Sequence, residues 1–174
     1  VGDKQGIANG YGNIGNIYSS LGNYPEALKN YFVCKKKYEE LGIKQGIANS
    51  YENIGATYAD QGDYPESLKN YFAALKIFEE TRDMVGIAES YLYIGENYRL
   101  QGKYPEALKN QFAALKLQEE IGDKDNIASS YAYIGDIYTG QKKHKEASDY
   151  YNKALSLSKE MGSLELIVDC YSGL

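Results

Sequence analysis

The sequence is poor in the side chains that most enzymes and metal sites depend on. Its 174 residues include one histidine, two cysteines and no tryptophan. The lone histidine, His144, can complete neither a Ser/His/Asp set nor a Cys/His set, and it has no repeated ligand geometry around it. We therefore expect a surface histidine, no enzyme activity, no metal and no cofactor.

The chain also lacks an excess of positive charge and lacks long apolar runs. Its net charge is −5, whereas binding to nucleic acid or to an anionic membrane requires clustered Lys and Arg. No apolar run approaches the roughly 20 residues of a membrane-spanning helix. There is no signal-peptide pattern and cysteine is scarce, so we expect a cytoplasmic protein without nucleic-acid or membrane partners.

What the chain does contain is one pattern repeated every 40 residues. Its copies open with Gly6-Ile7-Ala8, Gly46-Ile47-Ala48, Gly86-Ile87-Ala88 and Asn126-Ile127-Ala128. Self-similarity at a fixed period is typical of solenoids, in which each unit packs on its neighbours. We expect a single array over residues 1–174, with repeats 1–40, 41–80, 81–120 and 121–160 and a partial fifth repeat at 161–174. The truncated fifth repeat predicts self-association at that end.

Each copy contains two helical stretches. Ile47, Tyr51, Ile54 and Tyr58 share one helix face, and a break at residues 61–63 precedes a second helix from about Tyr64 to Glu80.

The start of the second helix carries a capping signal. Asp63 and Glu66 predict a capping box, and Asn23 with Glu26 repeats this signal in the first copy.

The second helix of copy one departs from the other copies. Cys34 takes a position that is alanine in the other copies, which predicts a buried thiol rather than a reactive one. Lys35 and Lys37 replace apolar residues, which predicts either an exposed cap with extended lysine stems or contact with an acidic neighbour.

The pattern resembles the tetratricopeptide repeat. Copy one reads Tyr11-x2-Ile14-Gly15-x2-Tyr18 and then Ala27-x3-Tyr31, and the other copies follow it closely. The period of 40 instead of 34 is similar to that of Pins-type adaptors, kinesin light chains and bacterial Rap-type or sensory arrays. This resemblance implies an all-α, right-handed superhelical solenoid of antiparallel helix pairs, with the first helix of each pair lining a concave groove.

The groove positions of the first half are rich in asparagine. The expected groove positions of copies one and two include Asn9, Asn13, Asn16, Asn49 and Asn53. Because an asparagine side chain both donates and accepts, such a ladder can pair with the backbone of an extended peptide. The resemblance strengthens this interpretation, since asparagine ladders hold peptides in Pins-type and Rap-type relatives. The alternative is a set of polar residues on a solvated helix face.

The groove positions of the second half are aromatic and acidic instead. They are Glu89, Tyr93, Glu96, Tyr133 and Asp136. Such a surface favours a ligand with an apolar or basic segment, unless the tyrosines pack within the array. The Lys and Arg residues of a carboxylate clamp are absent from these positions, so a chaperone tail is not expected.

These observations favour a protein-interaction module that binds an extended peptide or partner segment in the groove. The alternative is a structural or self-associating spacer, or a sensory array, within a larger signalling protein.

Overall fold

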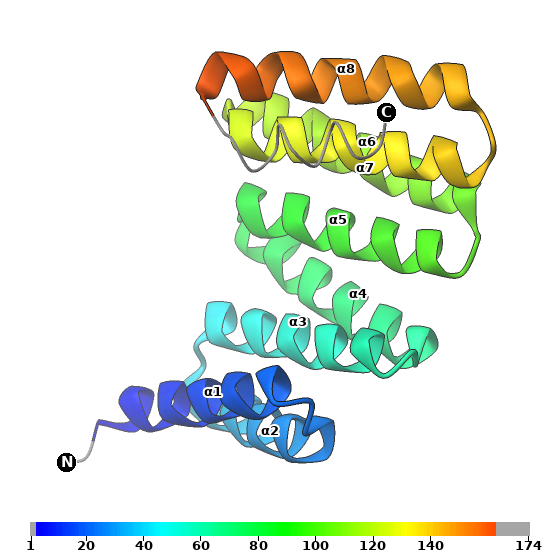
Figure 1. The fold of residues 1–174 in the computed structure, drawn as a ribbon. Coiled ribbons are helices and arrows are strands. Elements are labelled where there is room, and N and C mark those ends of the chain that lie inside the picture. Colours follow the sequence, from blue (N-terminus) through cyan, green and yellow to red (C-terminus); the bar gives the residue numbers. More distant parts are fainter. Residues whose placement is uncertain (1–2, 163–174) are drawn as a thin grey trace. The chain divides into compact units, whose positions relative to one another are not determined.

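The computed structural model describes residues 3–162, which form helices joined by short turns and contain no strand. The helices in this range are α1 (Lys4–Ser20), α2 (Tyr24–Leu41), α3 (Lys44–Asp60), α4 (Tyr64–Thr81), α5 (Met84–Leu100), α6 (Tyr104–Ile121), α7 (Lys124–Gly140) and α8 (His144–Met161). They pair as antiparallel hairpins, α1 with α2 and so on (Figure 1). The prediction of an all-helical fold built from antiparallel helix pairs is confirmed.

The helices form two compact units. In the first, the α1–α2 and α3–α4 hairpins are joined by packing of α2 against α3. In the second, the α5–α6 and α7–α8 hairpins are joined by packing of α6 against α7, with further contact between α5 and α7. The odd-numbered helices begin at residues 4, 44, 84 and 124, as the 40-residue period requires.

A tyrosine ring against a glycine brings the two helices of a hairpin together. A Cβ placed on Gly15 would lie 2.6 Å from the ring of Tyr31, and one on Gly135 would lie 2.8 Å from the ring of Tyr151. Both tyrosines are buried. The glycines of the Ile-Gly pairs therefore leave room for an aromatic ring between the helices.

The predicted helix cap is only partly correct. Asp63 Oδ1 accepts from the Glu66 backbone N–H at 3.3 Å, as expected. The Glu66 carboxylate does not complete the box: it pairs with Lys69 at 3.0 Å, while the Asp63 N–H donates to the Tyr58 carbonyl. The cap predicted at Asn23 is wrong, because its side chain makes no capping bond.

Lys35 and Lys37 of α2 each form an ion pair with a glutamate of the same helix. The side chain of Lys35 is only 19% exposed, its ammonium lies 4.5 Å from the ring centroid of Tyr51, and it pairs with Glu39 at 3.5 Å. Lys37 pairs with Glu40 at 3.0 Å. Lys35 thus contributes its stem to packing between hairpins, and its head meets an acidic neighbour on its own helix.

The expected partial fifth repeat, Cys170 and the self-associating end lie outside the described residues. Cys34 is buried, as its alanine equivalents predicted. Across residues 3–162, no helix combines the length and the hydropathy needed to cross a bilayer.

Replacing Gly15 with alanine should destabilise the first hairpin by about 1–3 kcal/mol, because the added methyl would collide with the buried Tyr31 ring. Replacing Gly10 on the same helix should instead stabilise it by up to about 1 kcal/mol, since a Cβ there meets no atom within 4 Å and alanine favours helix. Urea unfolding followed by circular dichroism measures both. Equal effects would contradict the proposed contact.

Candidate functional site

The five asparagines predicted to form a ladder line one cavity in the first unit. α1 supplies three of them and α3 supplies two, and the cavity has a volume of about 370 Å³. Its other lining residues are Gly12, Cys34, Tyr38, Gly46 and Ser50. The structure therefore brings the predicted first-half residues onto one concave surface.

Two of these asparagines have their amide oxygens bound by tyrosines of α2. The Tyr31 hydroxyl donates to Asn16 Oδ1 at 2.7 Å, and the Tyr38 hydroxyl donates to Asn9 Oδ1. Both tyrosines come from α2 and are buried, and burial raises the pKa of each phenol. The bonds fix the orientation of Asn9 and Asn16 and leave their amide N–H groups as donors. These two residues therefore also hold the hairpin together.

The other three asparagines differ in whether their side-chain amides already form hydrogen bonds within the protein. Asn49 Oδ1 accepts from Gln45 at 3.3 Å. Within residues 3–162, Asn13 and Asn53 have no side-chain hydrogen bond, and Asn13 is exposed while Asn53 is half-buried. Only these two keep both a free acceptor and free donors. They are the residues best prepared to pair with a peptide N–H and C=O together.

Two side chains of α2, Cys34 and Tyr38, also line the cavity, although the sequence did not predict them there. A Cβ on Gly46 would lie 2.3 Å from the Tyr38 ring, so this tyrosine can lie beneath α3 only because residue 46 is glycine. The Ser50 hydroxyl donates to the Gly46 carbonyl at 2.6 Å and lies 3.5 Å from the Cys34 sulfur. The sequence does show that this position differs between copies. Copy one has Tyr38 where the other copies have Phe78, Gln118 and Ser158.

The predicted second-half residues lie on α5 and α7, which contact each other within the second unit. Tyr93 and Tyr133 are exposed rather than packed in the core. Glu89, Glu96 and Asp136 are half-buried. The aromatic and acidic side chains thus belong to two neighbouring first helices of the same unit.

An arginine neutralises part of this acidic surface. Arg99 binds Glu96 with both ends of its guanidinium, at 2.6 Å from Nε to Oε2 and 2.6 Å from Nη2 to Oε1. The hydrogen bond to Glu96, with a contribution from Asp136, raises the pKa of Arg99. The sequence prediction did not foresee this pair, although the Glu-x2-Arg spacing on a helix is a known signal for it.

Asp136 is also engaged within its own hairpin. The Tyr151 hydroxyl donates to Asp136 Oδ1 at 2.7 Å, the same bond that Tyr31 makes to Asn16 in the first hairpin. Burial first, and then this bond to a carboxylate, raises the pKa of Tyr151 to about 12. The acidic surface is therefore less open to a basic ligand than its composition indicated.

Comparison with known proteins identifies the architecture. Two family models, both described as tetratricopeptide repeat, match the chain, one at residues 46–111 and 86–160 and the other at residues 7–40. The chain belongs to the tetratricopeptide repeat family. This family is in general a protein-interaction fold. A search of curated proteins finds no match.

Several solved structures share this tetratricopeptide fold. Aspartyl phosphate phosphatase F from Bacillus subtilis is 16% identical, with a TM-score of 0.91 over 98% of this chain and 45% of its own. A STAND signal-transduction ATPase with a tetratricopeptide repeat sensor from Pyrococcus horikoshii is 20% identical, with a TM-score of 0.88 over 99% and 27%. A Rap protein complexed with competence and sporulation factor is 18% identical, with a TM-score of 0.79 over 93% and 46%.

These likenesses concern the fold, and the chain spans less than half the length of each of these three structures. The resemblance to Rap-type and sensory tetratricopeptide arrays is confirmed at this level. Within the described tetratricopeptide helices, no group of three or more His, Cys, Asp or Glu residues could hold a metal ion, and His144 is exposed at the start of α8.

The bond between Tyr31 and Asn16 should be measurable as a coupling energy. Asn16→Ala should cost about 0.5–2 kcal/mol because it leaves the buried Tyr31 hydroxyl without its acceptor, whereas Asn13→Ala should change stability by less than about 0.5 kcal/mol. A double-mutant cycle of Asn16→Ala with Tyr31→Phe, read by urea unfolding, isolates the pair. Additive effects would contradict a structural role for Asn16.

Tyr151 should remain neutral well above the ordinary tyrosine pKa of 10. Because its folded-state pKa is raised, its stabilising contribution is fully present below pH 10 and is lost as the pH rises through about 12. Asp136→Asn should lower this pKa but leave it raised, since burial is the larger cause. Carbon-13 NMR of tyrosine Cζ, assigned with Tyr151→Phe, follows the titration. Ionisation at the ordinary pKa in the unmodified protein would refute the assignment.

Proposed function

We propose that this chain is a protein-interaction module that binds an extended peptide or partner segment in the asparagine-lined cavity between α1 and α3. The observation that carries the proposal is the convergence of five asparagines on one cavity, two of them with unused amide groups. Asparagine amides can pair with backbone N–H and C=O groups whatever the side chains are. Such a surface suits an extended segment, whose backbone polar groups need partners.

The asparagines have different roles in this proposal. Asn13 and Asn53 each donate to and accept from the peptide backbone. Asn9 and Asn16, held by the α2 tyrosines, contribute only N–H donors, which suits peptide carbonyls. A cavity of about 370 Å³ has room for a few residues rather than a folded partner.

The second unit adds a separate contact surface with other chemistry. Tyr93 and Tyr133 provide exposed aromatic area with a polar tip, which suits an apolar side chain of the partner. Of the three acidic residues, Glu96 is paired with Arg99 and Asp136 accepts from Tyr151, so a basic segment is still favoured there, although less than the composition alone indicated.

The relatives provide general support for a binding role. A Rap protein of the same fold has been solved in complex with competence and sporulation factor, so a fold of this kind accommodates a bound factor. The alternative is a self-associating spacer. A spacer would have no ligand for the cavity, and this distinguishes it from a peptide-binding module.

The test is a selection of peptides from a randomised library displayed on phage, using the intact chain as bait. For a selected synthetic peptide, the double variant Asn13→Ala/Asn53→Ala should weaken binding at least tenfold, because each lost amide removes two backbone hydrogen bonds. Asn110→Ala, on α6 of the second unit and outside the cavity lining, is the matched control and should leave peptide binding unchanged. Calorimetry measures the affinities, and circular dichroism checks that helicity is preserved.

A second arm tests backbone recognition directly. N-methylation of the peptide amides removes N–H donors and should reduce affinity for the intact chain but have little further effect on the double variant. Unchanged binding by the double variant, or a library that yields no ligand while the chain self-associates, would overturn the proposal.

A further inference from the structure

Four consecutive basic residues form the turn between α7 and α8 and the first residues of α8. They are Lys142, Lys143, His144 and Lys145, and all four are exposed. The equivalent residues of the first three copies are Gly-Asn-Tyr-Pro, Gly-Asp-Tyr-Pro and Gly-Lys-Tyr-Pro. Of the four copies, only the last is therefore basic at every one of these positions.

The lysines stand where the other copies have residues that favour the turn. Lys142 has a φ of 60°, whereas the glycines at this position of the other copies have φ values of 71°, 77° and 72°. The turn itself is unchanged, because the Lys142 N–H donates to the Thr139 carbonyl at 2.9 Å, the same distance as in copy one. A left-handed backbone favours glycine, and the first turn of a helix favours proline, which Lys145 replaces. Formation of the turn therefore does not explain the lysines.

The lysines of this turn concentrate positive charge. Within residues 3–162, Lys142, Lys143 and Lys145 form no ion pair, and neither does Glu146, the acidic residue in the first turn of α8. Like charges repel one another, and the N-terminal end of a helix dipole is itself positive. A bound anion would offset both unfavourable effects.

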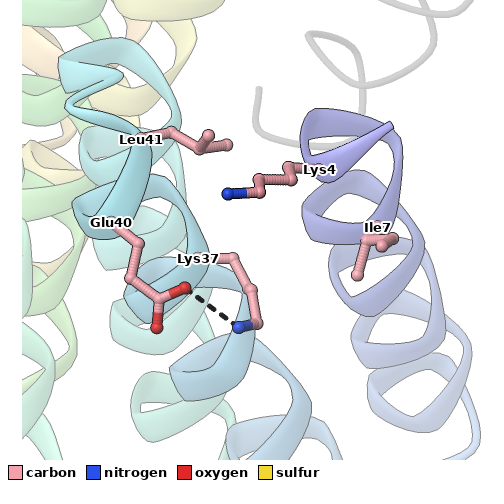
Figure 2. Close-up of a pocket in the computed structure, with 5 residues that line it drawn as sticks. All are labelled: Lys4, Ile7, Lys37, Glu40 and Leu41. Carbon is pink, nitrogen blue, oxygen red and sulfur yellow. Dashed lines mark hydrogen bonds and ion pairs between the residues drawn. The ribbon is translucent and has the colours of Figure 1, made fainter. Parts of the chain in front are cut away.

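Lysines also gather at the end of the first hairpin, but there a carboxylate lies among them. Figure 2 shows a cavity of about 380 Å³ that is lined in part by Lys4, Lys37 and Glu40. Lys37 pairs with Glu40 at 3.0 Å, and this bond, with smaller contributions from Lys36 and Lys4, lowers the Glu40 pKa. At the turn between α7 and α8, the described residues supply no such carboxylate.

Two tyrosine rings extend the basic surface from the turn along α8. The Lys143 ammonium lies 5.7 Å from the ring centroid of Tyr138, whose ring stacks on that of Tyr150 with 5.5 Å between centroids. The Lys153 ammonium lies 4.5 Å from the Tyr150 centroid. Where copy four has Tyr150 and Lys153, the other copies have asparagine and either valine or alanine. The surface is called the α8 basic strip below and consists of Lys142, Lys143, Lys145, Lys153, Tyr138 and Tyr150.

The geometry of the strip prepares it for an anion of limited length. Cation–π contacts hold the Lys143 and Lys153 ammonium groups, so less conformational entropy is lost when they bind an anion. The two lysines are ten positions apart, which corresponds to about 15 Å along a helix. An extended peptide covers that distance with about five residues. A matching ligand therefore carries negative charge at both ends of such a stretch.

The charge of the rest of the chain limits the kind of anion that the strip accepts. The chain has a net charge of −5 although the strip contributes four positive charges, so the other residues together carry −9. A nucleic acid or an anionic membrane extends far beyond the strip and would meet this negative charge. A short acidic segment of a protein can be confined to the strip, where the charges are complementary.

We propose that the α8 basic strip is a binding site for a short acidic segment of a partner protein. Carboxylates of the segment meet Lys143 and Lys153, and Lys142 and Lys145 add attraction at the turn. The strip shares no residue with the asparagine cavity, and the proposal does not depend on the peptide-binding function.

The experiment uses fluorescein-labelled octa-glutamate as the probe and measures its fluorescence anisotropy with the intact chain. Binding should be saturable, and it should weaken as the salt concentration rises, because the lysines are exposed. The variant Lys142→Gly/Lys143→Asn/Lys145→Pro gives the turn the residues of copy one and should weaken binding at least tenfold. It should also raise the melting temperature, since glycine returns to a left-handed position and proline to the first turn. Unfolding would then not account for the lost binding.

Two further variants test the position of the charges. Lys36→Gln/Lys76→Gln/Lys109→Gln removes the same amount of charge from exposed lysines of α2, α4 and α6 and should change the affinity by less than about twofold. Tyr150→Asn gives α8 the residue of the other copies and should weaken binding several-fold, because Lys153 loses the ring that holds it.

Four outcomes would overturn the proposal. Two are the lack of saturable binding up to about 1 mM and an equal loss of affinity in the turn variant and the three-glutamine control. A short DNA duplex that binds more tightly than octa-glutamate would assign the strip to nucleic acid instead. A dimer of the intact chain that the turn variant abolishes would assign the strip to a second copy.

Discussion

The contact on which the rest of the structure depends is the tyrosine ring packed against a helical glycine within a hairpin. Tyr31 lies over Gly15 and Tyr151 lies over Gly135, closer than a methyl group would permit. The contact sets how closely the two helices approach. The phenol ring lies between the two helices, and its hydroxyl reaches the first helix. There it donates to Asn16 in one hairpin and to Asp136 in the other. Packing and the polar surface are therefore coupled through one side chain.

The third hairpin shows what happens when this side chain is changed. Gln111 replaces the tyrosine, and its amide donates to the Leu92 carbonyl at 3.4 Å instead of reaching Glu96. Glu96 then takes its hydrogen bonds from Arg99 on its own helix. The residue at this position of the first helix also varies, being asparagine, alanine, glutamate and aspartate along the four copies, so copy two has no side-chain acceptor there. The residue of the first helix therefore decides whether a bound amide or a bound acid is presented, and the change from tyrosine to glutamine on the second helix accompanies the ion pair within α5.

The helices could be predicted from the sequence because they depend on local periodicity. Ile47, Tyr51, Ile54 and Tyr58 mark one face, and Tyr64 and Pro65 mark a start, whatever the neighbours do. The candidate site was harder to predict. Spacing placed five asparagines on one surface, but it could not separate Asn16, whose oxygen is bound by a tyrosine 15 residues away, from Asn13, which has no such partner. That distinction depends on how far a side chain reaches from another helix. The Arg99–Glu96 pair is local and could have been found from spacing alone.

The same architecture explains why Ile54 is buried while its equivalent on α1 is exposed. In a repeat array, each first helix has two faces to cover, and its own hairpin partner covers only one of them. α3 receives α2 on its second face and buries Ile54. On α1 the equivalent residue, Ile14, is 43% exposed. The next position along this face is almost fully buried in the other copies whether it is Thr57, Asn97 or Ile137, so its burial does not require an apolar side chain.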